Sequence, residues 1–210
     1  MLDRVQAHLE AIYALEPNLR VDDFLVTPEV ARALGHTGRS HEELLVHEDG
    51  DGLEVALVLD PALLRSLERY RAAPAEQLLD AALDSYCQVT EGVSHFLYLT
   101  HSAAKERRVS LLELEAQAEV DKFASCVLHA WRRGVRFAEQ LLRRLFDFVR
   151  YLPTLAAHER WRYQEANRLA RRYCRRLLRH IAEGRMDRFL TELRYCYRLG
   201  AEAKLQYLAQ

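Results

Sequence analysis

The chain has 210 residues, of which 50% are hydrophobic and 29% charged, and its formal net charge is −1. This composition excludes a disordered chain and is typical of a globular protein with one sizeable core or two small ones. Charges occur throughout the first predicted helix, which argues against a signal peptide, and no uncharged stretch is long enough to span a bilayer. We therefore expect a cytoplasmic protein, without membrane insertion.

The first 73 residues combine short helices with one β-hairpin. Thr27 and Asp60 each precede a proline, which predicts a helix N-cap followed by a first-turn proline. Two apolar runs around an Asp-Gly turn predict the hairpin. In chain order, the expected elements are a helix at 2–15, a short helix from Thr27 to Gly35, strands at 43–48 and 53–59, and a helix from Asp60 to Tyr70.

The remaining residues, 74–210, contain few helix breakers and predict a bundle of long helices. Ser110 and Glu113 form a capping-box pattern. The expected helices lie at 76–104, 110–131, 135–151, 155–183, 187–198 and 201–209. The fold is thus predicted as mainly α: a single helical domain, 1–210, with about seven to nine helices and one small β-hairpin near residues 43–59.

Charge is distributed unevenly along the chain. Residues 1–130 hold 23 acidic and 11 basic side chains, a formal balance of −12, whereas residues 131–210 hold 8 acidic and 19 basic side chains, a balance of +11. Such asymmetry indicates either a partner of opposite charge or two halves that complement each other.

The predicted helix at 76–104 is apolar around most of its circumference, which is typical of a helix buried inside its domain. One narrow stripe on this helix is polar, with members three or four residues apart. Glu91 and His95 are four residues apart, so their side chains meet on one face. The stripe consists of Asp84, Gln88, Glu91, His95, Tyr98 and Ser102.

The next helix carries a second polar stripe, formed by Glu115, Glu119 and Lys122. If the two stripes face each other, Glu91, His95, Glu115 and Glu119 are candidate ligands of a divalent metal such as Zn, Mn or Fe, because carboxylates with one imidazole suit these ions.

The order of elements around this set is similar to that of the gluzincin metallopeptidases, in which a hairpin and a helix with an H-E-x-x-H motif precede a glutamate on the following helix. Here the corresponding segment is Glu91-Gly92-Val93-Ser94-His95. Glu91 takes the place of the first histidine, and Gly92 that of the catalytic glutamate. The resemblance therefore implies a degenerate site without the base that activates water in peptide hydrolysis.

A structural interpretation of the same residues needs no cofactor. Glu91 and His95 would form a hydrogen-bonded pair, and Lys122 would neutralise Glu91 or Glu119. Buried networks of this kind, with Asp84, Gln88 and Tyr98 as further members, fix the register of packed helices. A metal-free acid–base site is a third alternative.

The predicted helix at 155–183 carries an arginine ridge beside its apolar core stripe. Arg168, Arg172, Arg175 and Arg179 follow helical spacing on one face, with Arg171 and Arg176 beside them. The ridge has three explanations: contact with the acidic part of the same chain, contact with an acidic surface of another protein, and binding of nucleic acid or anionic lipid.

No complete catalytic constellation accompanies these patterns. We therefore expect an intracellular protein–protein interaction or scaffold protein that works through its charged surfaces, or by self-association, without catalysis or a cofactor. A metal-binding enzyme centred on Glu91, His95 and Glu115 is the first alternative. Nucleic-acid binding through the arginine ridge is the second.

Overall fold

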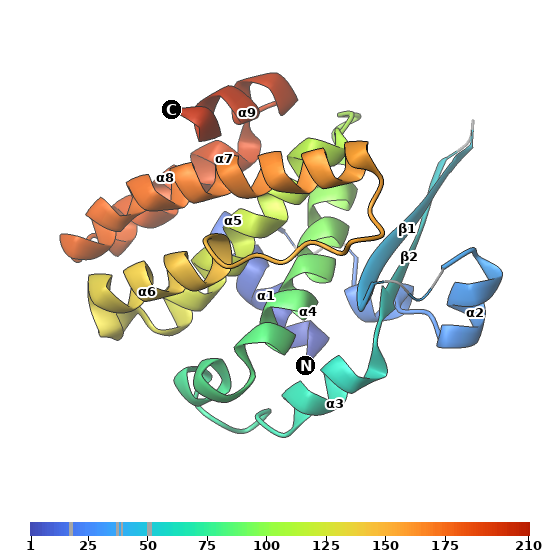
Figure 1. The fold of residues 1–210 in the computed structure, drawn as a ribbon, viewed down its shortest axis with the longest axis horizontal. Helices are drawn as coiled ribbons and strands as arrows, with labels where there is room; N and C mark the ends of the chain where they lie inside the picture. Colours follow the sequence, from blue (N-terminus) through green and yellow to red (C-terminus); the bar gives the residue numbers. More distant parts are fainter. Residues whose placement is uncertain (17–18, 37, 39, 50–51) are drawn as a thin grey trace. The chain divides into compact units, whose positions relative to one another are not determined.

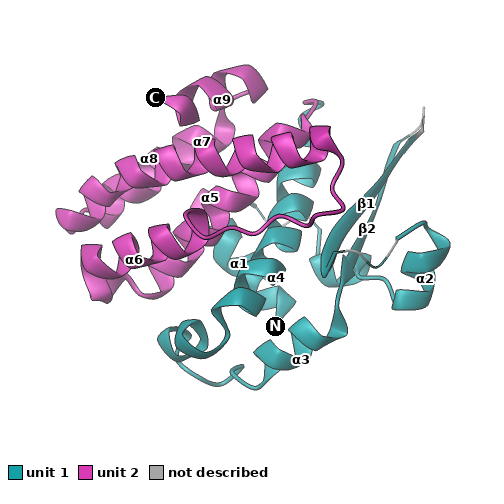
Figure 2. Ribbon diagram, in the orientation of Figure 1, with its two compact units in different colours: residues 1–11, 15–106 teal, residues 12–14, 107–210 magenta. Residues whose placement is uncertain are grey.

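The computed structural model of the protein describes residues 1–16, 19–36, 38, 40–49 and 52–210. Within these residues, nine α-helices and one antiparallel hairpin confirm the mainly α fold expected from the sequence. The chain forms two compact units (Figure 2). Unit 1 comprises residues 1–11 and 15–106, and unit 2 comprises residues 12–14 and 107–210. The expectation of a single domain over 1–210 stays a prediction.

Unit 1 contains the hairpin and the long helix that follows it (Figure 1). Helix α4 packs against both strands and against α3. None of the helices in the described part of the chain combines the length and apolar character that a membrane span requires. The elements are α1 (Leu2–Tyr13, whose last two residues belong to unit 2), η1 (Val21–Phe24), α2 (Pro28–Ala33), β1 (Glu42–Asp49), β2 (Gly52–Leu59), α3 (Pro61–Glu68) and α4 (Ala75–Ala103).

The hairpin confirms the strands expected near residues 43–59, and residues 50–51 of its turn lie outside the described residues. Glu42 pairs with Leu59, and Leu44 pairs with Leu57. Successive side chains of a strand point to opposite faces, so these four residues share one face of the hairpin. Leu57 and Leu59 are buried, and this face lies against α4. Glu42 is thereby directed toward α4.

Helix α4 bends at Ala82, whose backbone leaves the helical region with φ −141° and ψ 33°. The bend lies within the single helix that the sequence predicts at 76–104. Beyond it, every residue from Gly92 to Tyr98 is buried. A helix that is apolar around most of its circumference was expected to be buried inside its domain, and this segment of α4 is buried on all sides.

Unit 2 is a helical bundle arranged around α7, which contacts α5, α6, α8 and α9. The capping box at the start of α5 is present: Glu113 N donates to Ser110 Oγ (3.2 Å), and Ser110 N donates to a Glu113 carboxylate oxygen (3.4 Å). The elements are α5 (Leu111–His129), η2 (Trp131–Arg133), α6 (Gly134–Phe146), α7 (Ala157–Ala182), α8 (Met186–Arg198) and α9 (Ala201–Ala209).

One predicted helix is too long. The helix expected at 135–151 ends at Phe146, and residues 147–156 connect it to α7 without regular structure. Phe148 and Val149 are exposed, so a continued helix would bury neither of them in the core. Pro153 also disfavours the helical conformation of the residue before it. The helix therefore ends with its last buried residue.

Candidate functional site

The polar stripe of α4 runs from the surface of the protein into its interior. Asp84 is exposed, Gln88 and Glu91 are partly buried, and His95 and Tyr98 are 6% and 0% exposed. The stripe ends at Ser102, which is also buried. Burial of polar groups is unfavourable unless they interact with other polar groups or ions, so the buried end of the stripe is the part that needs a physical explanation.

His95 lies between two carboxylates of unit 1. Its Nδ1 is 3.7 Å from Glu42 Oε2, and both side chains are largely buried. A Glu91 carboxylate oxygen lies within 4.8 Å of a ring nitrogen of His95. The sequence indicated Glu91 but not Glu42, because no spacing in the chain connects β1 to α4. Only the hairpin register and its packing on α4 reveal the third member.

Gly92 makes this close packing of the hairpin on α4 feasible. A Cβ atom at this position would lie 3.1 Å from a Leu57 methyl group, 3.2 Å from Glu42 Oε2 and 3.3 Å from a Leu59 methyl group. These distances are shorter than ordinary van der Waals contacts. The residue that occupies the catalytic-glutamate position of the gluzincin pattern is thus a glycine for a packing reason.

The polar stripe of α5 belongs to unit 2, where its members have partners of opposite charge. Glu115 is 8% exposed and lies 3.5 Å from Arg162 Nε on α7. Lys122 Nζ donates to Glu119 at 3.0 Å, which agrees with the structural interpretation of these two residues. That the two stripes face each other, as the four-residue metal set requires, stays a prediction because the stripes belong to different units.

Unit 2 also buries a polar network that the sequence did not indicate. The Tyr13 hydroxyl donates to Asp121, and Gln117 Nε2 donates to Asp121 Oδ1 at 2.7 Å and to the Tyr13 oxygen at 3.1 Å. Burial raises the pKa of Tyr13 well above its usual value, and the Asp121 charge adds to this. The network orients the end of α1 within unit 2. We assign it a structural role.

Two further buried charges lie in unit 2. Glu113 is fully buried and accepts a hydrogen bond from Arg107 Nη1 at 2.5 Å. Lys204 is fully buried, with its ammonium 5.3 Å from the ring centroid of Tyr197. Burial lowers the pKa of Lys204 to about 8, although nearby acidic groups oppose this shift. The sequence indicates Glu113 as part of the capping box of α5 but not its contact with Arg107, and it does not indicate Lys204.

The arginine ridge lies on α7 as expected, and its members differ in their contacts. Arg171 donates to Asp147 at 2.6 Å. Arg176 lies over the rings of Tyr173 and Tyr207, at 5.1 and 4.9 Å, and donates to the Tyr207 carbonyl oxygen. These two arginines, which are only partly exposed, hold unit 2 together.

The other four ridge residues are exposed. Arg168 donates two hydrogen bonds to Glu165, which lower the pKa of that carboxyl group, and Arg179 donates to Glu192 at 2.9 Å. Arg172 and Arg175 have no hydrogen bond or ion pair with any of the described residues. The outward positive charge of the ridge is therefore concentrated at its centre.

Trp161 extends this exposed face toward the start of α7. It lies four residues before Glu165 and seven before Arg168, at the helical spacing of the ridge, and it is 58% exposed. The same spacing, read along the sequence, indicates Trp161 as a member of the face, although it is not an arginine. We call Trp161, Arg168, Arg172, Arg175 and Arg179 the α7 face.

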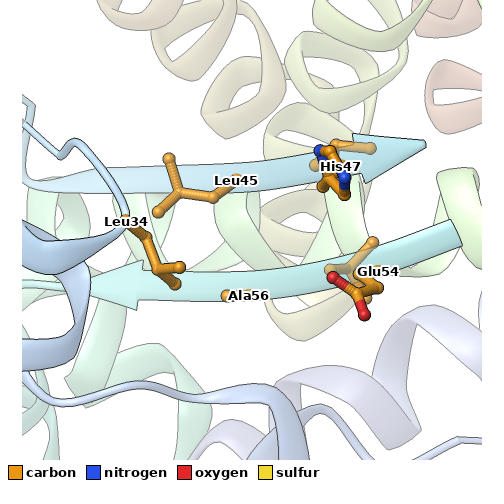
Figure 3. A pocket seen from close by; sticks show the side chains of 7 residues that line it. Leu34, Leu45, His47, Glu54 and Ala56 are labelled. Atoms are coloured by element: carbon orange, nitrogen blue, oxygen red, sulfur yellow. The ribbon is translucent and has the colours of Figure 1, made fainter. Parts of the chain in front are cut away.

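A hollow of about 630 Å³ lies on the hairpin of unit 1 (Figure 3). His47 and Glu54 are paired across the two strands and are the only charged or titratable side chains among the described residues that line the hollow. Apolar side chains make up the rest, so the hollow shows no convergent set of catalytic groups. Its lining consists of Leu34, Leu45, Val46, His47, Glu54, Val55 and Ala56.

The chain matches no family model, no curated protein and no solved structure. The similarity to gluzincins therefore rests on the order of elements and on His95 alone. The four cysteines, Cys87, Cys126, Cys174 and Cys196, are buried and unbridged.

Proposed function

We propose that the protein is an interaction protein whose unit 2 binds an acidic surface of another protein through the α7 face. The observation that carries this proposal is the state of Arg172 and Arg175: both are exposed, and neither has an ionic partner within the described residues. Arginine side chains with this exposure are suited to bidentate bonds with carboxylates of a partner.

The charge of unit 2 supports an acidic partner. Its residues carry 22 basic and 12 acidic side chains, a formal balance of +10, whereas unit 1 has a balance of −11. A surface with one dominant sign raises the rate at which an oppositely charged partner is encountered. The long-range charge and the local contacts of the α7 face thus favour the same class of partner.

Trp161 supports a protein partner in particular. Tryptophan and arginine are the residue types most enriched among those that dominate the energy of protein interfaces. An exposed tryptophan at the end of a row of arginines combines an apolar anchor with charged contacts. We infer a partner surface that presents carboxylates next to an apolar pocket.

Nucleic acid fits the α7 face less well. The carboxylates of Glu165 and Glu192 lie among the arginines and would repel a phosphate backbone. Tyr173 and Tyr197, which follow or precede arginines in the sequence, are 0% and 3% exposed and are not available to stack on bases. A patterned surface of both signs is better matched by a protein.

The test compares two double variants of equal charge change. Arg172→Glu/Arg175→Glu alters the α7 face, and Arg132→Glu/Arg188→Glu alters two exposed arginines of unit 2 elsewhere. Proteins captured from an extract of the native cell are quantified for the wild type and both variants, and self-association is measured by sedimentation. We expect the first variant to lose its acidic partner, or its self-association, by about tenfold or more, and the control to retain it.

Salt dependence and a DNA probe complete the test. Association through the α7 face must weaken as ionic strength rises. Equal association of both variants at low and moderate salt would contradict the proposal. Saturable binding to a generic duplex or single strand that the first variant alone loses would instead favour nucleic acid. The expected cytoplasmic location and the absence of catalysis stay predictions.

A further inference from the structure

Beyond this binding function, we propose that Glu91 and His95 of α4 are ligands of a divalent transition-metal ion, and that Glu42 of β1 orients the His95 ring for that role. The site lies in unit 1, separate from the α7 face of unit 2, and therefore does not depend on the proposed partner.

The donor atoms of Glu91 and His95 lie close enough to bind one ion. Glu91 and His95 are one helical turn apart, and a carboxylate oxygen of one lies within 4.8 Å of a ring nitrogen of the other. Two donor atoms bound to the same ion, each about 2.0–2.2 Å from it, are separated by less than this distance. A small rotation of either side chain brings both donors to one ion. Partial burial of the pair limits competition from water.

Glu42 lies on the Nδ1 side of the His95 ring. Its Oε2 lies 3.7 Å from His95 Nδ1, which is too long for a direct hydrogen bond but close enough to favour a proton on that nitrogen. A proton on Nδ1 leaves the lone pair of Nε2, on the opposite edge of the ring, available for a metal. Carboxylate–histidine–metal arrangements of this kind fix the tautomer and raise the basicity of the ligating nitrogen.

The donor set indicates the type of ion. One imidazole with carboxylate oxygen suits zinc, manganese or iron, whereas calcium and magnesium prefer oxygen donors alone. Two carboxylates beside one imidazole also give the site negative charge when the imidazole is neutral, which a divalent cation offsets. Two ligands from α4 leave further coordination positions to water or to other donors.

The experiment uses the untagged full-length chain, with Zn²⁺ alone in equilibrium dialysis and Co²⁺ alone as an absorption probe of nitrogen coordination. We expect the wild type to bind about one equivalent of metal saturably. His95→Ala and Glu91→Gln should each weaken binding more than tenfold, and the nitrogen-dependent Co²⁺ bands should vanish in His95→Ala. Glu42→Gln should weaken binding by about 10- to 100-fold, as expected for an orienting carboxylate.

The matched control is Glu43→Gln. Glu43 is the next residue of β1, so its side chain points to the opposite face of the hairpin, where it contacts His36. Its substitution should leave metal binding unchanged. Circular dichroism identifies variants that fail to fold; if His95→Ala does, His95→Gln replaces it. Wild-type binding below about a tenth of an equivalent, undiminished binding in the histidine variant, or equal losses in Glu42→Gln and Glu43→Gln would each overturn the proposal.

Discussion

The two units treat buried polar groups differently. In unit 2, buried Glu113 contacts Arg107, and buried Asp121 accepts hydrogen bonds from Tyr13 and Gln117. In unit 1, the Nδ1 of buried His95 lies 3.7 Å from the carboxylate of Glu42, which is outside hydrogen-bond range. These contacts of Glu113 and Asp121 are short and directed, whereas the distance between His95 Nδ1 and the Glu42 carboxylate is longer.

On the surface of unit 2, by contrast, two charged side chains have no ionic partner among the described residues. The α7 face of unit 2 presents Arg172 and Arg175 without an ionic partner among the described residues, and an exposed tryptophan lies toward the start of the same helix. This contrast indicates a different candidate region for function in each unit. In unit 2 the polar interior stabilises the fold and the surface is suited to binding, whereas in unit 1 the polar interior is itself the candidate site.

The largest effect should come from breaking the buried ion pair of unit 2. Glu113→Gln removes the charge that faces Arg107 and weakens the cap of α5, so we expect a loss of about 3–5 kcal/mol in the free energy of unfolding. Urea denaturation measures this loss. Glu159→Gln is the control, because Glu159 occupies the same N3 position of α7 and accepts one hydrogen bond from Ala156 N at an exposed helix end. It should cost about 1 kcal/mol or less.

Partner binding sharpens the same test. If the interior of unit 2 is only structural, the Glu113→Gln protein should still associate through the α7 face as the wild type does. The measurement is made without urea, where the variant remains folded. A variant that keeps its stability but loses its partner would show that Glu113 acts in binding, and the contrast between interior and surface would be wrong for this unit.

Much of this contrast could be predicted from the sequence. The proline-preceding caps Thr27 and Asp60, the Ser110 capping box and the alternation of the hairpin strands located helix starts and strands within a few residues. These signals are local, because capping and alternation depend on residues only two to four positions apart. The helical period predicted that Arg168, Arg172, Arg175 and Arg179 share one side of α7, but not that this side is exposed.

The remaining features depend on contacts between distant residues. Glu42 and His95 are 53 residues apart, and Tyr13 and Asp121 are 108 residues apart, so no periodicity connects them. The predicted end of α6 was wrong for a similar reason. The segment after Phe146 has helical composition, but Phe148 is exposed and does not pack in the core. The sequence therefore indicated Glu91 and His95 as candidates without their carboxylate neighbour on the hairpin.

The next largest effect concerns Lys204 and pH. Burial lowers its pKa from 10.5 to about 8, so the folded protein releases a proton that the unfolded chain retains between these values. The contribution of Lys204 to stability is therefore fully present above pH 10.5 and is lost as the pH falls through about 8. At 1.36 kcal/mol per pKa unit, the change across this window is about 3 kcal/mol.

The measurement is the difference in unfolding free energy between the wild type and Lys204→Met at several pH values. Tyrosines and cysteines that do not interact with Lys204 affect both proteins and cancel in the difference, whereas Cys196, whose pKa the Lys204 charge lowers, is replaced by Ser in both proteins. We expect the difference to rise in favour of the wild type from pH 8 to 10. Lys105→Met, at an exposed position of unit 1, controls for the loss of one positive charge. A difference that stays constant with pH would show that the Lys204 ammonium is fully compensated in the interior.

The smallest effect tests the packing that brings Glu42 to His95. In Gly92→Leu, the new side chain has to enter space already occupied by Leu57, Leu59 and the Glu42 carboxylate. Overpacking of this kind costs about 1–3 kcal/mol, more than the gain from replacing a helical glycine. Gly200→Leu is the matched control in unit 2, because a Cβ at Gly200 has no neighbour within 4 Å and its φ is −69°. Urea denaturation should show a loss for the first variant and little change for the second.

The same variant separates stability from site geometry. A leucine at position 92 that displaces the hairpin must also move Glu42 away from His95 Nδ1, so metal binding should weaken along with stability. If stability falls while metal binding is unchanged, the hairpin contributes only to the packing of unit 1, and Glu42 does not orient the imidazole. If both properties fall together in Gly92→Leu and neither falls in Gly200→Leu, the close approach at Gly92 is what connects the fold of unit 1 to its chemistry.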